Sequence, residues 1–191
     1  MQPVPRCPRC ATPDSHGHCG ICADDDPLDA TLTLGHYTQP FDSLILQLKF
    51  GGRLPAAGWI ATRLAEKVGA SGALPDLLVP VPLSASRLAE RGYNQAWEIA
   101  RPLARRLRVR ASATLLLRHR ETASQRTLDL TARLANLQQA FAVSQDAKLD
   151  GLHIGLVDDV MTTGATLREA VRILKAHGAA RVTALTALRT P

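Results

Sequence analysis

Aromatic residues make up only 4% of this 191-residue sequence, so a folded core must rest on leucine, alanine and valine. The hydrophobic fraction of 46% is typical of a globular protein. No apolar run approaches the ~18 residues that a membrane-spanning helix needs. The N-terminus also lacks the apolar core of a secretory signal, because the cysteine-containing segment Cys7–Cys10 begins almost at once. We therefore expect a cytoplasmic protein without a membrane partner.

Two common nucleotide-binding motifs are absent as well. The sequence has no Gly-Lys dipeptide, which the phosphate loop of P-loop NTPases requires. It has no G-x-G-x-x-G string either, which excludes the usual Rossmann dinucleotide site. A phosphate-binding function must therefore use a different loop.

The net charge of +6 is unevenly distributed. The segment from Arg101 to Arg133 contains nine arginines and only two acidic residues, which gives it a net charge of +7. The segment Asp14–Asp29, by contrast, contains five aspartates and no Lys or Arg. The asymmetry favours a polyanionic partner such as phosphates, pyrophosphate or nucleic acid. For arginines 101 to 110, a solvated helix face is an equally good interpretation.

The first thirty residues differ from the rest, because they hold all four cysteines and end in the acidic run Asp24–Asp26. We therefore predict a small unit over residues 1–30 and a main domain over residues 31–191. In the main domain, hydrophobic patterning predicts strands at 31–36, 77–79, 115–117, 153–157 and 181–188. It predicts helices at 41–49, 58–68, 84–107, 130–141 and 167–174, with Pro102 kinking or splitting the third of them. This alternation predicts an α/β fold with a mostly parallel sheet covered on both faces.

The segment Leu156–Thr166 is the strongest candidate site. An apolar strand runs into Asp158 and Asp159, and a turn of small residues then opens a helix. Ligands of open α/β sheets bind beyond the carboxyl ends of the strands, and the first N–H groups of a helix favour an anion. Gly164 allows close backbone approach, and the two carboxylates suit ribose hydroxyls or a bound Mg²⁺. The alternative is a plain strand, turn and helix with solvated aspartates.

The string VDDVMTTGAT resembles the ribose-phosphate loop of type I phosphoribosyltransferases. The remainder of the chain resembles one branch of that superfamily, the ComF/GntX (competence protein F-like) family associated with bacterial DNA uptake and use. The matching pieces are the paired N-terminal cysteines, Ile45–Phe50, Pro80–Leu83, Arg87, Arg91–Gln95, Thr122, Gln125, Arg133, Asn136 and the loop itself.

The resemblance implies a role for each matching residue. The ribose 2′ and 3′ hydroxyls would bind Asp158 and Asp159. The 5′-phosphate would lie in the loop formed by Met161, Thr162, Thr163, Gly164, Ala165 and Thr166. Pyrophosphate would contact the turn Val81, Pro82, Leu83 and Ser84, with Arg87, Arg91 and Arg120 nearby. A mobile flap over residues 118–126 would close over it, and Arg118 would complete the catalytic set with the two aspartates.

One position departs from the superfamily pattern. Enzymes of this type that act on 6-oxopurines carry a carboxylate base in the loop where this chain has Thr162. A threonine does not accept that proton at neutral pH. Either the acceptor is activated elsewhere, or it is not such a purine, or the protein binds its ligand without turnover.

The cysteines form two pairs, Cys7-x-x-Cys10 and Cys19-x-x-Cys22. Four thiolates in this pattern suit a tetrahedral zinc site, although the segment between the pairs is shorter than the ~15–20 residues of common double-pair sites. Two disulfides or free thiols are the alternatives, and a reducing cytoplasm disfavours disulfides. We predict a structural zinc knuckle, because four protein ligands leave no open position for chemistry.

Together these patterns predict a type I phosphoribosyltransferase-like parallel sheet flanked by helices, with a small N-terminal zinc knuckle held by the four cysteines. One functional hypothesis is a protein that binds phosphoribosyl diphosphate with magnesium and serves DNA uptake and natural transformation. Its further partners would be single-stranded DNA and proteins of the uptake machinery. The alternative is an active phosphoribosyltransferase that moves ribose-5-phosphate to a nucleobase-like acceptor.

Overall fold

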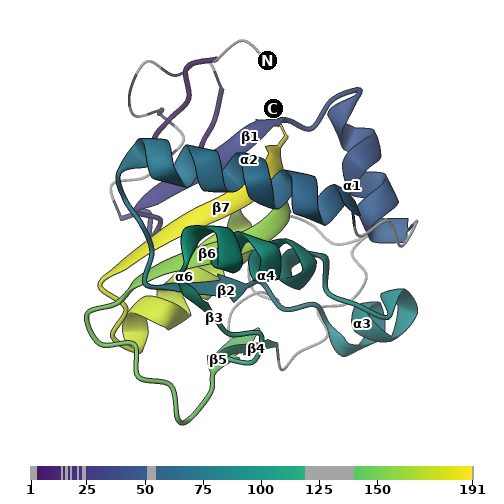
Figure 1. The fold of residues 1–191 in the computed structure, drawn as a ribbon. Coiled ribbons are helices and arrows are strands. Elements are labelled where there is room, and N and C mark those ends of the chain that lie inside the picture. The colour runs from purple at the N-terminus through teal and green to yellow at the C-terminus, as the bar shows by residue number, and fades with distance from the viewer. Residues whose placement is uncertain are drawn as a thin grey trace, which may run out of the picture.

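The computed structural model describes residues 4–190 except 14, 16, 18, 21, 23, 24, 51–54 and 119–139 (Figure 1). In chain order the elements are β1 (Ala30–His36), α1 (Phe41–Phe50), α2 (Pro55–Ser71), β2 (Leu77–Pro80), α3 (Ala85–Arg91), α4 (Gln95–Leu107), β3 (Arg110–Ala111), β4 (Leu116–Arg118), β5 (Phe141–Val143), β6 (His153–Met161), α6 (Ala165–Ala176) and β7 (Arg181–Arg189). Within the described part of the chain, no helix is long and apolar enough to cross a membrane.

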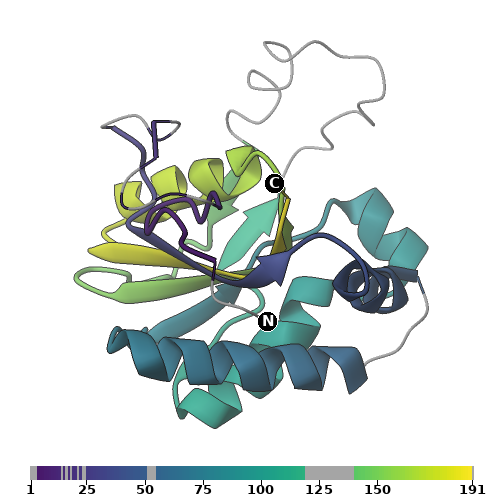
Figure 2. The same ribbon diagram turned by 90° about the horizontal axis from the view of Figure 1, so that it is seen from above.

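The main sheet has five strands in the order β1-β7-β6-β2-β3, and every neighbouring pair is parallel. The helices α2 and α4 cover one face of this sheet, and α6 covers the other (Figure 2). The predicted α/β architecture with a parallel sheet covered on both faces is therefore confirmed. Parallel strands need such a double cover because both of their faces are apolar.

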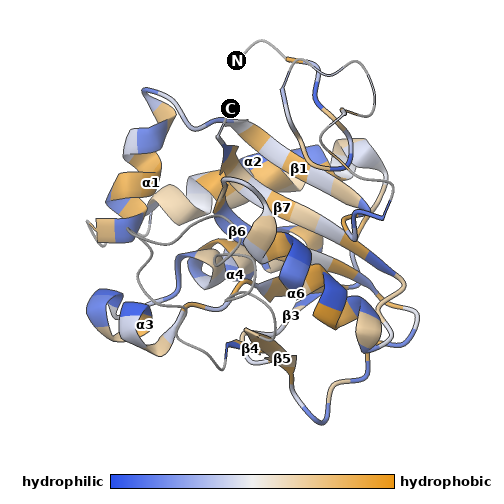
Figure 3. Ribbon diagram, turned by 180° about the vertical axis from the view of Figure 1, so that it is seen from behind, coloured by the Kyte–Doolittle hydropathy of each residue, from blue (hydrophilic) through white to orange (hydrophobic). Residues whose placement is uncertain are grey.

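Each face of the sheet has its own hydrophobic core. On the α2 and α4 face, leucine and isoleucine side chains such as Leu64 and Ile99 pack on the sheet. On the other face, Leu167 and Leu174 of α6 pack on it together with Cys7 of the N-terminal segment. Hydrophobic and hydrophilic bands alternate along α6, as Figure 3 shows, because only one side of that helix meets the sheet.

The long helix predicted over 84–107 is split, but not at Pro102. The break lies at Gly92, which adopts a left-handed backbone with φ of 76° and closes α3. The Asn94 side chain then accepts a hydrogen bond from the Ala96 amide and starts α4. Pro102 lies buried inside α4, where packing of Ile99 and Leu103 against the sheet holds the helix together.

Three further features differ from the sequence prediction: the sheet to which β4 belongs, the end of one helix and the end of β6. The segment around Leu116 forms β4, which pairs with β5 in a separate antiparallel sheet. The helix predicted to end at Phe141 lies outside the described residues up to 139, but its last residue is wrong, because Phe141 belongs to β5. Strand β6 continues to Met161, so that the two aspartates lie within the strand.

Candidate functional site

A cleft of about 200 Å³ opens at the carboxyl end of β2 and β6. Its lining brings together four segments that are far apart in the sequence: the end of α1, the turn after β2 with α3 and the start of α4, the end of β4, and the end of β6. The lining residues are Lys49, Val81, Pro82, Leu83, Arg87, Arg91, Asn94, Gln95, Ala96, Arg118, Asp158, Asp159, Val160, Thr162 and Thr166. The position agrees with the rule that open α/β sheets bind ligands beyond the carboxyl ends of their strands.

The acidic pair, Asp158 and Asp159, is part of the lining of this cleft. The Asp159 backbone amide donates to Asp158 Oδ1 over 2.8 Å, and Lys49 Nζ lies 3.2 Å from Asp159 Oδ2. Burial, and then the charge of Asp159, raise the pKa of Asp158 to about 8. Two neighbouring carboxylates resist simultaneous ionisation unless a cation lies between them. Lys49 supplies one positive charge in this structure.

The raised pKa of Asp158 predicts a pH-dependent stability. The pKa of this carboxyl group rises from its ordinary 3.8 to about 8 in the folded protein. Between these pH values the ligand-free folded protein keeps a proton that the unfolded chain releases. Its contribution to stability therefore falls as the pH rises from about 4 to 8. Asp158→Asn keeps the Oδ1 acceptor and should raise the melting temperature at pH 8. The expected rise is about 2–4 °C for each kcal/mol gained in the free energy of unfolding.

Thermal unfolding of the parent and the variant at pH 4.5 and pH 8 measures this effect. The stabilisation should be large at pH 8 and small at pH 4.5. Asp146→Asn, at an exposed turn before β6, is the control. An equal stabilisation at both pH values would contradict the assignment.

The loop after the acidic pair adjoins the cleft and surrounds a smaller cavity of about 40 Å³. Gly164 caps the start of α6 with φ of 79°, and no side chain caps the helix there. The Ala165 amide donates to Thr163 Oγ1, so the next amides of the first turn, those of Thr166 and Leu167, are the ones available to an anion. The positive φ favours glycine at this position, and a Cβ there would also displace the ends of the Met161 and Arg168 side chains.

Three arginines, Arg87, Arg91 and Arg118, line the same cleft as the acidic pair and form its arginine wall. The Arg91 guanidinium lies 5.3 Å from the centre of the Phe50 ring and donates from Nη1 to Gln95 Oε1 over 3.0 Å. Arg118 lies 5.6 Å from the centre of the Phe141 ring. Burial, and then the neighbouring charge of Arg87, lower the pKa of Arg118, while the charge of Asp158 acts in the opposite direction. A wall of this charge suits a phosphate or diphosphate group.

The cleft and the smaller cavity collect most of the residues that the sequence singled out. Two of them have different surroundings: Ser84 caps α3 by accepting from the Arg87 amide, and Thr163 is exposed and accepts from the Ala165 amide. Arg120 and the rest of the predicted flap to residue 126 lie outside the described residues, apart from Arg118.

Sequence reasoning gave no role to Lys49, Asn94 or Gln95, although all three line the cleft. The Asn94 amide donates to the Val81 carbonyl over 3.0 Å and so fixes the turn after β2. Gln95 is only 1% exposed, and its Nε2 has no hydrogen-bond partner among the described residues. Lys49 and Gln95 belong to segments that carry the family resemblance, and this resemblance was the one signal that could have identified them. The spacing of residues in the sequence does not show which side chains they contact.

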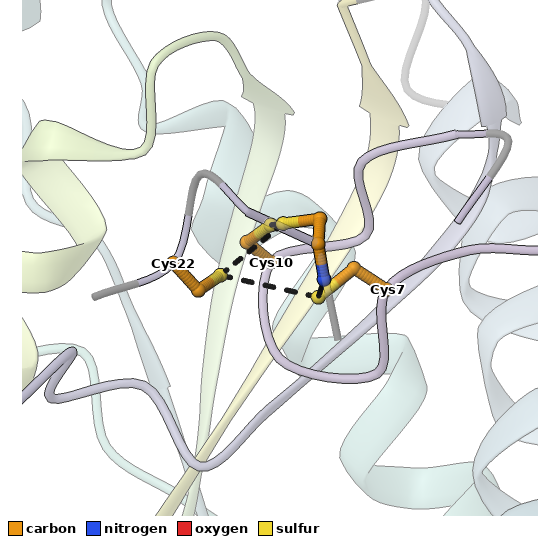
Figure 4. Close-up of side chains that lie close together, drawn as sticks. Cys7, Cys10 and Cys22 are labelled. Atoms are coloured by element: carbon orange, nitrogen blue, oxygen red, sulfur yellow. Dashed lines mark hydrogen bonds between the residues drawn. The ribbon is translucent and has the colours of Figure 1, made fainter. Parts of the chain in front are cut away.

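The four cysteines converge at the N-terminal segment, where their sulfur atoms all lie within 4.8 Å of one another (Figure 4). The Sγ separations are 3.9 Å for Cys7 and Cys22, 3.3 Å for Cys10 and Cys19, and 3.6 Å for Cys19 and Cys22. No disulfide joins them. Tetrahedral zinc with bonds of ~2.3 Å places its sulfur ligands roughly 3.8 Å apart. The cluster therefore fits a metal ion bound by four cysteines.

Residues 53–191 match the family described as "Phosphoribosyl transferase domain". The fold and the cleft thus belong to a protein of the phosphoribosyltransferase-like class. Among solved structures, the purine phosphoribosyltransferase from Pyrococcus horikoshii Ot3 is similar over 70% of this chain and 83% of its own, with a TM-score of 0.45 and 16% identity.

The curated relatives define the family more narrowly. The DNA utilization protein YhgH of Escherichia coli K12 is 36% identical over 184 residues, which cover 92% of this chain and 80% of that protein. Competence protein F of Haemophilus influenzae is 35% identical, over 84% of this chain and 73% of the relative. Competence protein ComFC of Bacillus subtilis is 31% identical, over 96% and 78%. This chain belongs to the ComF family of phosphoribosyltransferase-like proteins.

Proposed function

We propose that this protein binds phosphoribosyl diphosphate with Mg²⁺ and acts in DNA uptake, where it also binds single-stranded DNA. The observation that carries the ligand assignment is the cleft lined by the acidic pair and the arginine wall, together with the smaller cavity that adjoins it at the amino end of α6. The role in DNA uptake rests on the relatives named as competence and DNA utilization proteins. Proteins of the uptake machinery are further partners in this proposal.

The ligand would occupy the cleft by charge complementarity. Asp158 and Asp159 accept hydrogen bonds from the ribose hydroxyls, and residues 161–166 hold the 5′-phosphate at the start of α6. The diphosphate lies along the turn 81–84 against Arg87, Arg91 and Arg118. The paired carboxylates and the diphosphate oxygens are ligands that Mg²⁺ prefers. The metal would neutralise charge between them.

In this proposal zinc is the structural metal of the N-terminal segment. The sulfur spacing described above and the chemistry of four thiolates support it. A reducing cytoplasm, where we place the protein, keeps the cysteines available as thiolates. Residues 1–30 then form the zinc knuckle and residues 31–191 the ligand-binding domain.

Transfer of ribose-5-phosphate to an acceptor is the second candidate function. The arginine wall favours it, because positive charge stabilises a departing pyrophosphate. The residue at position 162 argues against transfer, because the hydroxyl of Thr162 cannot act as the carboxylate base. Among the described residues, the only carboxylates that line the cleft are the two aspartates that would hold the ribose. A transferase reaction here would need an acceptor that requires no separate carboxylate base.

One experiment separates the two candidates. Calorimetric titration of the metal-loaded protein with phosphoribosyl diphosphate and Mg²⁺ tests binding, and pyrophosphate release tests turnover against a panel of nucleobases with and without single-stranded DNA. Binding without release supports the binding function. Release that depends on one base identifies an enzyme, and absence of binding would reject both.

A basic surface supports the DNA part of the proposal. All five arginines between positions 101 and 110 are exposed, on α4, at its C-terminal cap and at the start of β3. Two aromatic side chains close to these arginines in the sequence are held by the fold: Trp97 is partly buried against the core, and the Tyr93 hydroxyl donates to the Leu48 carbonyl. The exposed rings are Phe50, at 68%, and Trp59, at 44%.

Single-stranded DNA should bind with an affinity that falls as salt rises. Each phosphate contact should add ~0.7 to the slope of log affinity against log salt. Changing Arg105, Arg106 and Arg108 to glutamine should weaken binding and reduce that slope by about 2, as measured by fluorescence anisotropy. The matched control removes three exposed charges elsewhere, with Lys148→Gln, Arg172→Gln and Arg181→Gln. If both variants lost the same DNA affinity, Arg105, Arg106 and Arg108 would be interpreted as part of an ordinary solvated surface.

A further inference from the structure

The cysteine segment packs against the loop that follows β6, on the face of the sheet that α6 covers (Figures 2 and 4). One core cluster contains Cys7 and Cys10 together with Met161 of the loop and Leu167 of α6. Two arginines, Arg168 and Arg189, join the two regions through hydrogen bonds.

Arg168 forms the first connection. Its Nε donates to Asp26 Oδ2 over 2.8 Å, and its Nη1 donates to the Thr163 carbonyl over 2.7 Å. The side chains of this ion pair are 18% and 3% exposed. A single guanidinium therefore links the segment just after Cys22 to the turn of the phosphate loop. Gly164 packs directly beside Nη1.

Arg189, the last residue of β7, forms the second connection. Its Nε donates to the Cys10 carbonyl over 3.3 Å, and its Nη1 donates to the Met161 carbonyl over 3.4 Å and to the Thr190 carbonyl over 2.7 Å. Burial, and then the charge of Arg168, lower the pKa of Arg189, whereas negative charge on Cys10, Cys19 and Cys22 raises it. Arg189 therefore ties the backbone of a predicted metal ligand, Cys10, to the end of β6.

We propose that metal occupancy of the four-cysteine cluster controls the phosphate loop, with Arg168 as the positioning residue that transmits it. The metal fixes the segment that ends at Asp26, Asp26 holds the Arg168 guanidinium, and Arg168 holds the Thr163 carbonyl. The loop amides then point toward the anion. Loss of the metal releases this segment, and the loop loosens. The effect on ligand affinity rests on the function proposed above, whereas the effect on loop order does not.

Hydrogen exchange tests the coupling without any ligand. Removing the metal with a chelator should accelerate exchange of the amides at residues 162–166. Ribose-5-phosphate is the binding probe: its affinity should fall on the order of 10-fold after chelation. Saturating probe should raise the equilibrium affinity for the metal by the same factor, because coupling between two binding sites is reciprocal. Unchanged loop exchange after chelation overturns the proposal.

Substitutions test the route of the coupling. Arg168→Gln should retain the metal, but chelation should then have little effect on loop exchange or on probe affinity. Asp26→Asn is a milder variant that should give the same result if Arg168→Gln fails to fold. Arg172→Gln, one turn further along α6 and paired with Glu169, is the matched control and should keep full coupling.

The outcomes for the inference and for the proposed function are distinct. Full coupling in both Arg168→Gln and Asp26→Asn overturns the role of Arg168. A metal-loaded parent that does not bind ribose-5-phosphate contradicts the proposed function, while loop exchange still decides the inference.

Discussion

Asp158→Asn combined with Asp159→Asn is expected to abolish the rise in melting temperature that phosphoribosyl diphosphate and Mg²⁺ give the parent protein. A ligand that binds only the folded state stabilises it in proportion to its affinity. Each aspartate is expected to contribute a charge-assisted hydrogen bond worth ~1.5–3 kcal/mol, so the double substitution should weaken binding on the order of 100-fold or more. Thermal shift and calorimetry measure the loss.

Loss of folding is not expected to explain this result. Asn preserves the acceptor for the Asp159 amide and removes the repulsion that raises the pKa of Asp158. Asp146→Asn with Asp150→Asn changes the same number of charges at exposed positions near the opposite end of β6 and is the matched control. If the double variant of the acidic pair bound as tightly as the parent, the ribose assignment would be wrong.

The second large effect is expected from Cys7→Ser combined with Cys10→Ser. The purified parent should contain about one zinc per chain, and the variant should contain none. Both side chains are 1% exposed and lie in the same core as α6, so the melting temperature should fall on the order of 10 °C. The second core, with α2 and α4, contains no cysteine, and the sheet should therefore still unfold cooperatively.

Elemental analysis and thermal unfolding measure the two parts of this prediction. Chelation of the parent should reproduce the destabilisation, and the variant should be insensitive to the chelator. A parent prepared without chelators that contains almost no metal would refute the zinc assignment. Asp158→Asn with Asp159→Asn serves as the reciprocal control, because it should keep its zinc.

Local patterns in the sequence were sufficient to locate features that are built from neighbouring residues. The strand, two aspartates, small-residue turn and helix of 156–166 are contiguous, so their position at the end of a sheet strand could be predicted before the fold was known. The alternation of strands and helices likewise predicted the parallel sheet. The cysteine pairs predicted a compact cluster, which the structure forms.

Tertiary packing decided the features that join distant segments. Lys49 reaches Asp159 only because α1 packs beside the end of the sheet, and Arg168 meets Asp26 only because the N-terminal segment packs against α6. Tertiary packing also explains why α4 continues through Pro102, since burial of that helix outweighs the local cost of a proline. Local propensity is set by the residues themselves, whereas these contacts depend on which surfaces the fold buries together.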